Sequence, residues 1–193
     1  ALLLLGAAWA AGRVSDALAQ PFALDGSDGA LALEGARVDD PVPITPLVDQ
    51  HGRAVRPDAF PGRPVLVTFA FAHCETVCPV VVHDVLNARD REPAARAVVL
   101  VVTLDPWRDT PSRLPAIADG WGLTGEAHVL SGDPEVVEQV LTRWRVPRLR
   151  SRQTGDVTHP AMVYVVQDAR IRYALPGGEE AIRAALRALA PAG

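Results

Sequence analysis

Residues 64–79 read PVLVTFAFAHCETVCP, and this stretch decides the fold. Residues 64–71 form an apolar run of strand length that is continuous rather than alternating, which is typical of a strand covered on both faces of its sheet. Pro79 lies near the start of a helix predicted over residues 77–90, where a missing amide hydrogen costs least. The stretch therefore predicts a central buried strand that leads into a helix, with Cys74 and Cys78 at the junction.

Strands and helices alternate along the rest of the chain. The predicted strands cover residues 44–48, 53–55, 64–71, 97–104, 127–130, 161–166 and 170–175. The predicted helices cover residues 77–90, 112–121, 134–144 and 179–189. This alternation, followed by a terminal hairpin and helix, predicts an α/β domain with a thioredoxin-like fold, in which a mixed central β-sheet has helices on both faces.

The composition limits the classes of function. A chain of 193 residues suffices for one compact domain and a short appendage. An apolar fraction of 49% and a charged fraction of 22% are those of an ordinary globular protein. All 19 basic residues are arginines, and they are scattered among 23 acidic residues to give a net charge of −4. We therefore expect no nucleic-acid partner, because a phosphate backbone requires a dense basic surface.

The N-terminal region differs in composition from the rest. Residues 1–11 are apolar or small and Ala17-Leu18-Ala19 resembles a cleavage site, so residues 1–19 are predicted to be a signal peptide or an N-terminal membrane anchor, truncated at its start. Residues 20–41 are predicted to be a linker and residues 42–193 the folded domain. Export matters because two nearby cysteines can form a disulfide in an oxidising compartment but stay reduced or bind metal in the cytosol.

Cys74 and Cys78 are the only two cysteines, and four residues is about one helical turn. Both sulfurs can therefore lie on one face of the helix. The amide hydrogens and positive dipole end of a helix N-terminus favour the thiolate, the form that binds a metal ion or attacks a disulfide. Two buried structural cysteines and a purely structural disulfide remain as alternative interpretations.

His159 precedes the penultimate predicted strand, and in a thioredoxin-like topology its loop lies beside the start of the cysteine-bearing helix. Cys74, Cys78 and His159 would together offer two soft sulfurs and one imidazole nitrogen. This set suits one copper(I) ion, whereas zinc would require a fourth ligand. We therefore predict that these three residues form a metal site and that the two cysteines also form a redox pair.

Three segments resemble the Sco/SenC family in content and order: residues 73–79 (HCETVCP), residues 105–111 (DPWRDTP), and Thr158-His159 before an apolar strand. The resemblance covers residues 42–189 and implies a thioredoxin-like fold. It implies that Cys74, Cys78 and His159 bind copper, and that the protein is a metallochaperone that delivers copper(I) to the CuA site of cytochrome c oxidase. Some family members resemble thiol-disulfide reductases, so an oxidoreductase that acts on cysteines of an exported copper protein is the alternative.

The resemblance also implies partners and a location. The expected partner is a copper-accepting oxidase subunit, or another periplasmic copper or redox protein. The expected location is the periplasm or the outer face of the bacterial inner membrane, with a membrane tether through the N-terminus.

The chain departs from the family's usual pattern at three positions. Thr76 replaces an aspartate between the cysteines, and Thr158 replaces an aspartate before the histidine. Pro160 replaces a small hydroxyl residue, at a place where thioredoxins have a cis-proline. Since cis peptides occur almost only before proline, we hypothesise a cis bond between His159 and Pro160, which would favour the redox interpretation.

Residues 105–111 are predicted to form a loop whose aspartates cap the following helix and pair with Arg108. The remaining candidate histidines are predicted to lie on the surface or on helix faces; they are His51, His83 and His128. Two weaker interpretations are a peroxide-reducing enzyme, for which Thr68 and Arg108 give only a loose indication, and a binding module with an inert disulfide.

Overall fold

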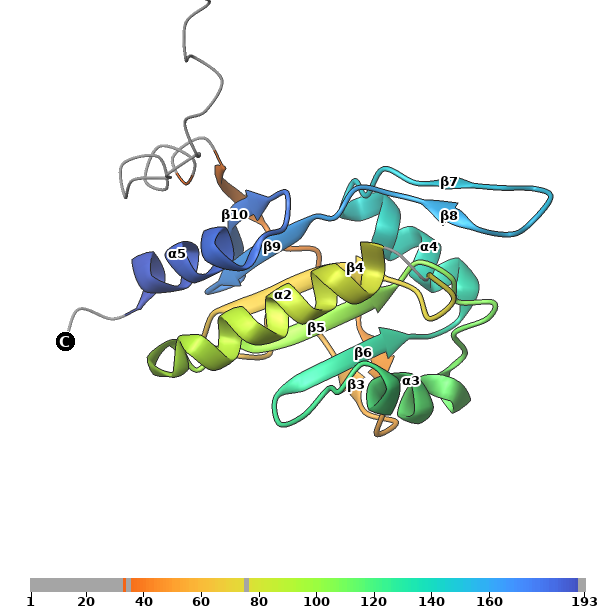
Figure 1. Cartoon of the computed structure of the whole chain (residues 1–193), viewed down its shortest axis with the longest axis horizontal. Coiled ribbons are helices and arrows are strands. Elements are labelled where there is room, and N and C mark those ends of the chain that lie inside the picture. Colours follow the sequence, from red (N-terminus) through yellow and green to blue (C-terminus); the bar gives the residue numbers. More distant parts are fainter. Residues whose placement is uncertain (1–32, 34–35, 75–76, 191–193) are drawn as a thin grey trace, which may run out of the picture.

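The computed structural model describes residue 33 and residues 36–74 and 77–190 (Figure 1). The predicted signal peptide or anchor at residues 1–19, most of the predicted linker, and the departure at Thr76 lie outside the described residues. Within the described ranges, no helix is long and apolar enough to span a bilayer.

An eight-stranded mixed sheet forms the centre of the domain, with the strand order β1-β10-β9-β4-β5-β6-β2-β3. Its strands are β1 (Arg37–Pro41), β2 (Leu47–Asp49), β3 (Ala54–Val55), β4 (Val65–Ala70), β5 (Val98–Thr103), β6 (Ala127–Ser131), β9 (Val163–Gln167) and β10 (Arg170–Leu175). β4, β5 and β6 run parallel, and β9 pairs antiparallel with β4. Every residue of β4 and β5 is buried, which confirms the prediction of strands covered on both faces.

Helices cover both faces of the sheet, as predicted (Figure 1). α2 (Val77–Arg91) and α5 (Glu179–Leu189) pack against each other on one face. α3 (Leu114–Gly120) follows the short 3-10 helix η2 (Pro111–Arg113) and covers β6 on that same face, because both parallel crossovers are right-handed and run in one direction. α4 (Pro134–Arg143) lies on the opposite face. A further 3-10 helix, η1 (Pro93–Ala95), follows α2.

Segments that are distant in the sequence meet along one edge of the sheet, the edge at which the parallel strands end. The carboxyl ends of β4, β5 and β6 meet there because these strands are parallel, and the chain enters antiparallel β9 at the same edge. The N–H of Leu104 donates to the carbonyl of Ala70 at 2.9 Å. The Thr68 hydroxyl donates to the carbonyl of Met162 at 2.9 Å. The first bond joins the end of β5 to the end of β4, and the second joins β4 to the segment that precedes β9.

β1 occupies part of the segment that the sequence analysis assigned to a linker. It pairs antiparallel with β10 at the edge of the sheet, so the folded domain begins before residue 42. The strand is mostly exposed and contains Arg37, Asp39 and Asp40, and it therefore lacks the alternation of apolar residues that identifies most strands. A charged edge strand also discourages pairing with another chain.

A second, two-stranded sheet lies between α4 and β9 and was not predicted. β7 (Leu149–Arg150) and β8 (Val157–Thr158) pair antiparallel, and we call residues 149–158 the β7–β8 ribbon (Figure 1). Strands of two residues are too short for any period of hydrophobicity to show in the sequence.

His128 is buried, which corrects the prediction that it lies on the surface or on a helix face; His51 and His83 are exposed as predicted. His128 belongs to β6 and is 5% exposed. Its Nδ1 lies 3.2 Å from Oδ2 of Asp49, whereas its Nε2 is buried without a hydrogen-bond partner among the described residues. A proton on Nε2 would therefore bury an unsatisfied charged donor.

The burial of His128 predicts a dependence of stability on pH. Burial lowers the pKa of His128, with a contribution from Arg53, although the carboxylates of Asp49 and Glu126 act in the opposite direction. In the unfolded chain the pKa returns to about 6.5, so the unfolded state binds more protons as the pH falls and the free energy of unfolding decreases. We expect urea unfolding to show this decrease between about pH 7.5 and about pH 5.

The variant His128→Asn should lose that part of the pH dependence, and the exposed control His83→Asn should retain it. Equal slopes of unfolding free energy against pH in the wild-type protein and in His128→Asn would contradict the prediction.

Candidate functional site

Cys74 lies in the turn after β4, and Cys78 lies in the first turn of α2. The N–H of Cys74 donates to the carbonyl of Phe71 at 3.2 Å, and the N–H of Cys78 donates to Sγ of Cys74 at 3.4 Å. Both residues are thiols; Cys74 is half-buried and Cys78 is fully buried. An amide at the start of the helix thus stabilises negative charge on the more exposed sulfur.

His159 reaches Cys78 from the loop that precedes β9. Its Nε2 lies 3.4 Å from Sγ of Cys78, and its Nδ1 lies 3.0 Å from the carbonyl oxygen of Pro160. Because a carbonyl oxygen can only accept, Nδ1 carries the proton and the lone pair of Nε2 faces the sulfur. Burial also lowers the pKa of His159, so the imidazole is neutral. A neutral imidazole with its second nitrogen fixed by a hydrogen bond is the form that binds metal ions.

The burial of Cys78 opposes the thiolate form that the helix N-terminus was expected to favour. Burial raises the pKa of the Cys78 thiol well above its usual range, and the hydrogen bond with Cys74 and the charge of Asp109 act in the same direction. Desolvation of this buried sulfur outweighs the helix dipole. A metal ion that binds this sulfur must therefore displace a proton, and Nε2 of His159 lies 3.4 Å away to receive it.

Asp109 is a buried carboxyl group that anchors the turn before Cys74. Its Oδ2 accepts from the Thr103 hydroxyl at 2.7 Å and from the N–H of Ala72 at 3.1 Å, whereas Oδ1 is buried without a hydrogen-bond partner in the described part of the chain. Burial raises the pKa of Asp109 above its usual range. The side chain binds the end of β5 and the turn after β4, and does not cap the following helix as predicted.

Replacing Asp109 with asparagine is expected to lower the pKa of Cys78, because the substitution removes a negative charge that disfavours the thiolate. The amide oxygen can still accept from Thr103 and Ala72. In a Cys74→Ser background, the ultraviolet absorbance of the thiolate should therefore appear at lower pH in an alkaline titration. The exposed control Asp119→Asn should leave this absorbance unchanged, and an unchanged signal in Asp109→Asn would contradict the prediction.

Asp105 is buried and binds two arginines, which confirms its predicted pairing with Arg108. The second arginine is Arg150, whose guanidinium lies 3.2 Å from Oδ1 of Asp105. Arg108 and Arg150 both donate to the carbonyl of Gly155, at 3.1 and 2.9 Å. Asp105 therefore links the loop after β5 to the β7–β8 ribbon, and its side chain does not cap the following helix.

The peptide bond between His159 and Pro160 is trans, so the hypothesis of a cis bond is wrong. Proline lowers the cost of a cis bond but does not impose one. The carbonyl of Pro160 accepts from the N–H of Met162 at 3.0 Å and from Nδ1 of His159, which closes a tight turn with a trans bond. The redox interpretation loses the support that a cis bond would have given it.

The structure does not favour a peroxide-reducing site. Thr68 uses its hydroxyl to bond the carbonyl of Met162, and Arg108 uses its guanidinium to bond Asp105 and Gly155. Both residues suggested for such a site therefore have structural partners.

Cys78 is in contact with both other predicted metal ligands, with His159 through Nε2 and with Cys74 through a side-chain hydrogen bond. The described contacts join Cys78 to His159 and the amide of Cys78 to the sulfur of Cys74. Across the ranges that the structure describes, no three His, Cys, Asp or Glu side chains form a group that could already hold a metal ion.

The protein has a thioredoxin-like sheet with two cysteines at the start of a helix. A histidine from the loop before an antiparallel strand lies beside them. These features define a class of thiol- and metal-binding α/β proteins. The sequence model for SCO1/SenC matches residues 45–190, and the chain belongs to this family.

Relatives and solved structures agree with this assignment. The mitochondrial SCO2 homologue of Bos taurus is 32% identical over 133 residues, which cover 62% of this chain and 47% of that protein. Apo Sco1 from Thermus thermophilus is 28% identical with a TM-score of 0.65, and the match covers 79% of this chain and 94% of that one. Bradyrhizobium japonicum ScoI with copper bound is 28% identical with a TM-score of 0.60, and the match covers 78% and 99%. Matches to the first two curated relatives span 64% and 47% of their lengths.

Proposed function

We propose that the protein binds one copper(I) ion through Cys74, Cys78 and His159 and delivers it to the CuA site of cytochrome c oxidase. The observation that supports this proposal is the 3.4 Å contact between Sγ of Cys78 and Nε2 of a neutral His159. Two thiolates and an imidazole are soft donors that suit copper(I). The similarity to Bradyrhizobium japonicum ScoI with copper bound also supports it.

The three ligands would have different tasks. Cys78 is fully buried beside His159, whereas Cys74 is half-buried and is the more accessible of the two cysteines. Ligand exchange with a partner would therefore begin at the Cys74 sulfur. Oxidation of the two thiols to a disulfide releases two electrons and two protons and removes two of the three ligands, so the protein must be reduced to carry copper.

A copper(I) titration tests the proposal. The fully reduced protein, titrated in competition with a chromogenic copper(I) chelator, should bind about one copper per chain. Protein that has first been oxidised to the Cys74–Cys78 disulfide should bind little. A stoichiometry well below one in the reduced protein would reject copper binding at this site.

The second candidate is a thiol-disulfide oxidoreductase, favoured by the hydrogen bond from the Cys78 amide to the Cys74 sulfur. The Cys74 thiolate would attack a disulfide of the partner to form a mixed disulfide. Cys78 would then lose its proton to His159 and attack Sγ of Cys74, which leaves a Cys74–Cys78 disulfide and two thiols on the partner. This candidate predicts turnover with a protein disulfide in the absence of copper.

We also propose that the protein acts outside the cytoplasm, in the periplasm or on the outer face of the inner membrane. The apolar composition of residues 1–11 and the Ala17-Leu18-Ala19 sequence support this location. Fractionation of cells that express the full-length gene, followed by N-terminal sequencing, would test both export and cleavage.

A further inference from the structure

Trp107 is an exposed aromatic residue that its neighbours hold in place. Its side chain is 53% exposed, and the guanidinium of Arg150 lies 4.4 Å from the centre of its ring. Arg150 is itself fixed by Asp105 and by the carbonyls of Leu104 and Gly155. A large aromatic group whose position is already fixed loses little entropy on binding, and tryptophan is enriched among the residues that dominate interface energies.

A hollow of about 430 Å³ lies beside Trp107. Leu104, Val146 and Val157 line it together with Glu138, Arg148 and Arg150, and Glu138 is paired with Arg148. A mixed lining of aliphatic side chains and guanidinium groups suits an aliphatic or aromatic side chain flanked by carboxylates.

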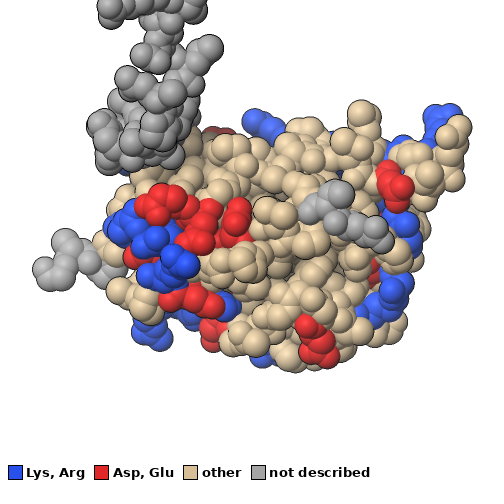
Figure 2. Space-filling model, viewed as in Figure 1, with Lys and Arg blue, Asp and Glu red and all other residues tan. Residues whose placement is uncertain are grey.

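The segment that runs from the end of α4 through the ribbon is basic, although the whole chain has a net charge of −4. Residues 143–158 contain one acidic residue, Asp156, and five arginines, which are Arg143, Arg145, Arg148, Arg150 and Arg152. Arg145 and Arg152 are exposed and make no ion pair with any residue that the structure describes. Figure 2 shows basic groups along the edge of the molecule that the ribbon occupies.

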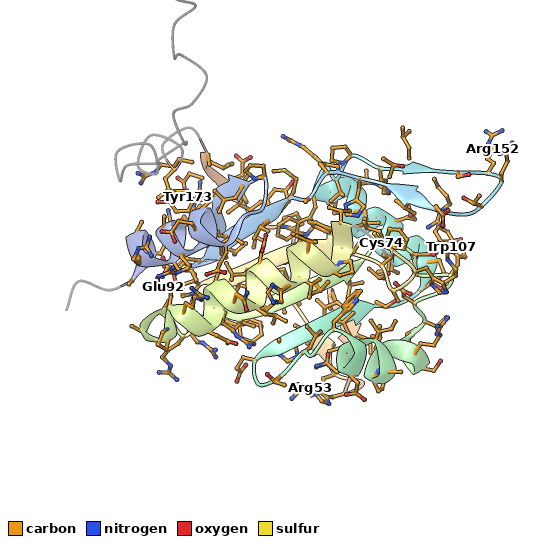
Figure 3. All side chains as sticks on the ribbon, in the orientation of Figure 1. Arg53, Cys74, Glu92, Trp107, Arg152 and Tyr173 are labelled. Carbon is orange, nitrogen blue, oxygen red and sulfur yellow. The ribbon has the colours of Figure 1, made fainter. Side chains whose placement is uncertain are left out.

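Figure 3 shows that Cys74, Trp107 and Arg152 lie toward the same end of the molecule. A partner that covers the ribbon and Trp107 would therefore come close to the more accessible sulfur of the candidate site. A membrane surface would also attract arginines, but it would not require an apolar hollow with a fixed indole at its border.

We propose that Trp107, the hollow beside it and the β7–β8 ribbon, together called the Trp107 surface, dock an acidic segment of the protein that exchanges copper or electrons with Cys74. This inference rests on the proposed function, which states what is exchanged with the partner: copper or electrons. The segment presents an apolar side chain to the hollow and carboxylates to the exposed guanidinium groups of Arg152 in the ribbon and of Arg145, four residues before the ribbon. Long-range attraction speeds the encounter, and contact with Trp107 sets the lifetime of the complex.

The test uses the soluble copper-accepting domain of cytochrome c oxidase subunit II as the probe. Its affinity for the reduced, copper-free protein is measured by calorimetry at low and high salt. Trp107→Ala should weaken binding by about tenfold or more at both salt concentrations. The double variant Arg145→Glu/Arg152→Glu should weaken it by about tenfold at low salt, and this difference should shrink at high salt because exposed charges are screened.

The matched control is Arg37→Glu/Arg96→Glu, which changes the net charge equally at exposed arginines outside the basic segment of residues 143–158. Equal effects of the two double variants, or no effect of Trp107→Ala, would overturn the proposal. It would also be overturned if the wild-type protein did not bind the domain, or if the ribbon variants lost binding only to phosphatidylglycerol vesicles.

Copper titration of the same variants separates this proposal from the proposed function. None of the substituted residues is a candidate ligand, so each variant should still bind about one copper. Normal copper binding with unaltered docking would reject the Trp107 surface alone. Failed copper titration with altered docking would reject only the copper function.

Discussion

Replacing Cys78 with serine is expected to abolish stoichiometric copper(I) binding. Cys78 is fully buried, and its sulfur lies 3.4 Å from Nε2 of His159. Cys78 is therefore the central residue of the candidate site. A hydroxyl group has nearly the same size but remains protonated and is a hard donor that copper(I) disfavours. We expect the stoichiometry measured against a chromogenic chelator to fall from about one to below about 0.1.

His51→Ala, a substitution of an exposed histidine, serves as the control and should bind copper as the wild-type protein does. Circular dichroism should show that Cys78→Ser is folded, since serine can still donate to His159. Wild-type copper affinity in Cys78→Ser would show that copper is bound elsewhere.

His159→Ala separates copper binding from the formation of the disulfide. This substitution removes a copper ligand but leaves both sulfurs able to form a disulfide. Under the copper proposal, the affinity for copper should fall by about tenfold or more, whereas the yield of the Cys74–Cys78 disulfide on mild oxidation should not change.

The sequence predicted those parts of the fold that strong patterns encode. The buried runs at β4 and β5 are continuous, and β10 and α5 have the predicted bounds because alternation and amphipathicity are clear there. The approach of His159 to Cys78 follows from topology, because an antiparallel strand beside β4 must begin where β4 ends. Asp105 and Arg108 paired as predicted because they lie three residues apart.

Features that depend on three-dimensional surroundings were not predictable. The burial of His128 depends on Asp49, which is 79 positions away, and the protonation of Cys78 depends on desolvation that no local pattern records. β1 and the β7–β8 ribbon are short or charged, so neither has a hydrophobic period. The structural task of Asp109 was missed, although its position in the DPWRDTP segment marked it as unusual.

Phe69→Ala is expected to destabilise the domain by about 3–5 kcal/mol, a large part of the about 5–15 kcal/mol that stabilises a typical domain. Phe69 is 2% exposed in the central strand β4. Its ring meets Trp144, the C-cap of α4, and Tyr164 of β9, with centroids 5.7 and 5.9 Å away and in edge-to-face geometry. Alanine would leave a cavity between the sheet and α4 and would remove both aromatic contacts.

Urea unfolding measures this loss, and Phe60→Ala is the matched control. Phe60 is only partly buried, so its truncation should cost less, about 1 kcal/mol. Equal losses in the two variants would contradict a central role for Phe69. Because Phe69 packs toward α4 whereas the cysteines belong to the start of α2 on the other face, the folded fraction of Phe69→Ala should still bind about one copper. A substitution on the α4 face of the sheet would then lower stability without altering metal binding on the α2 face.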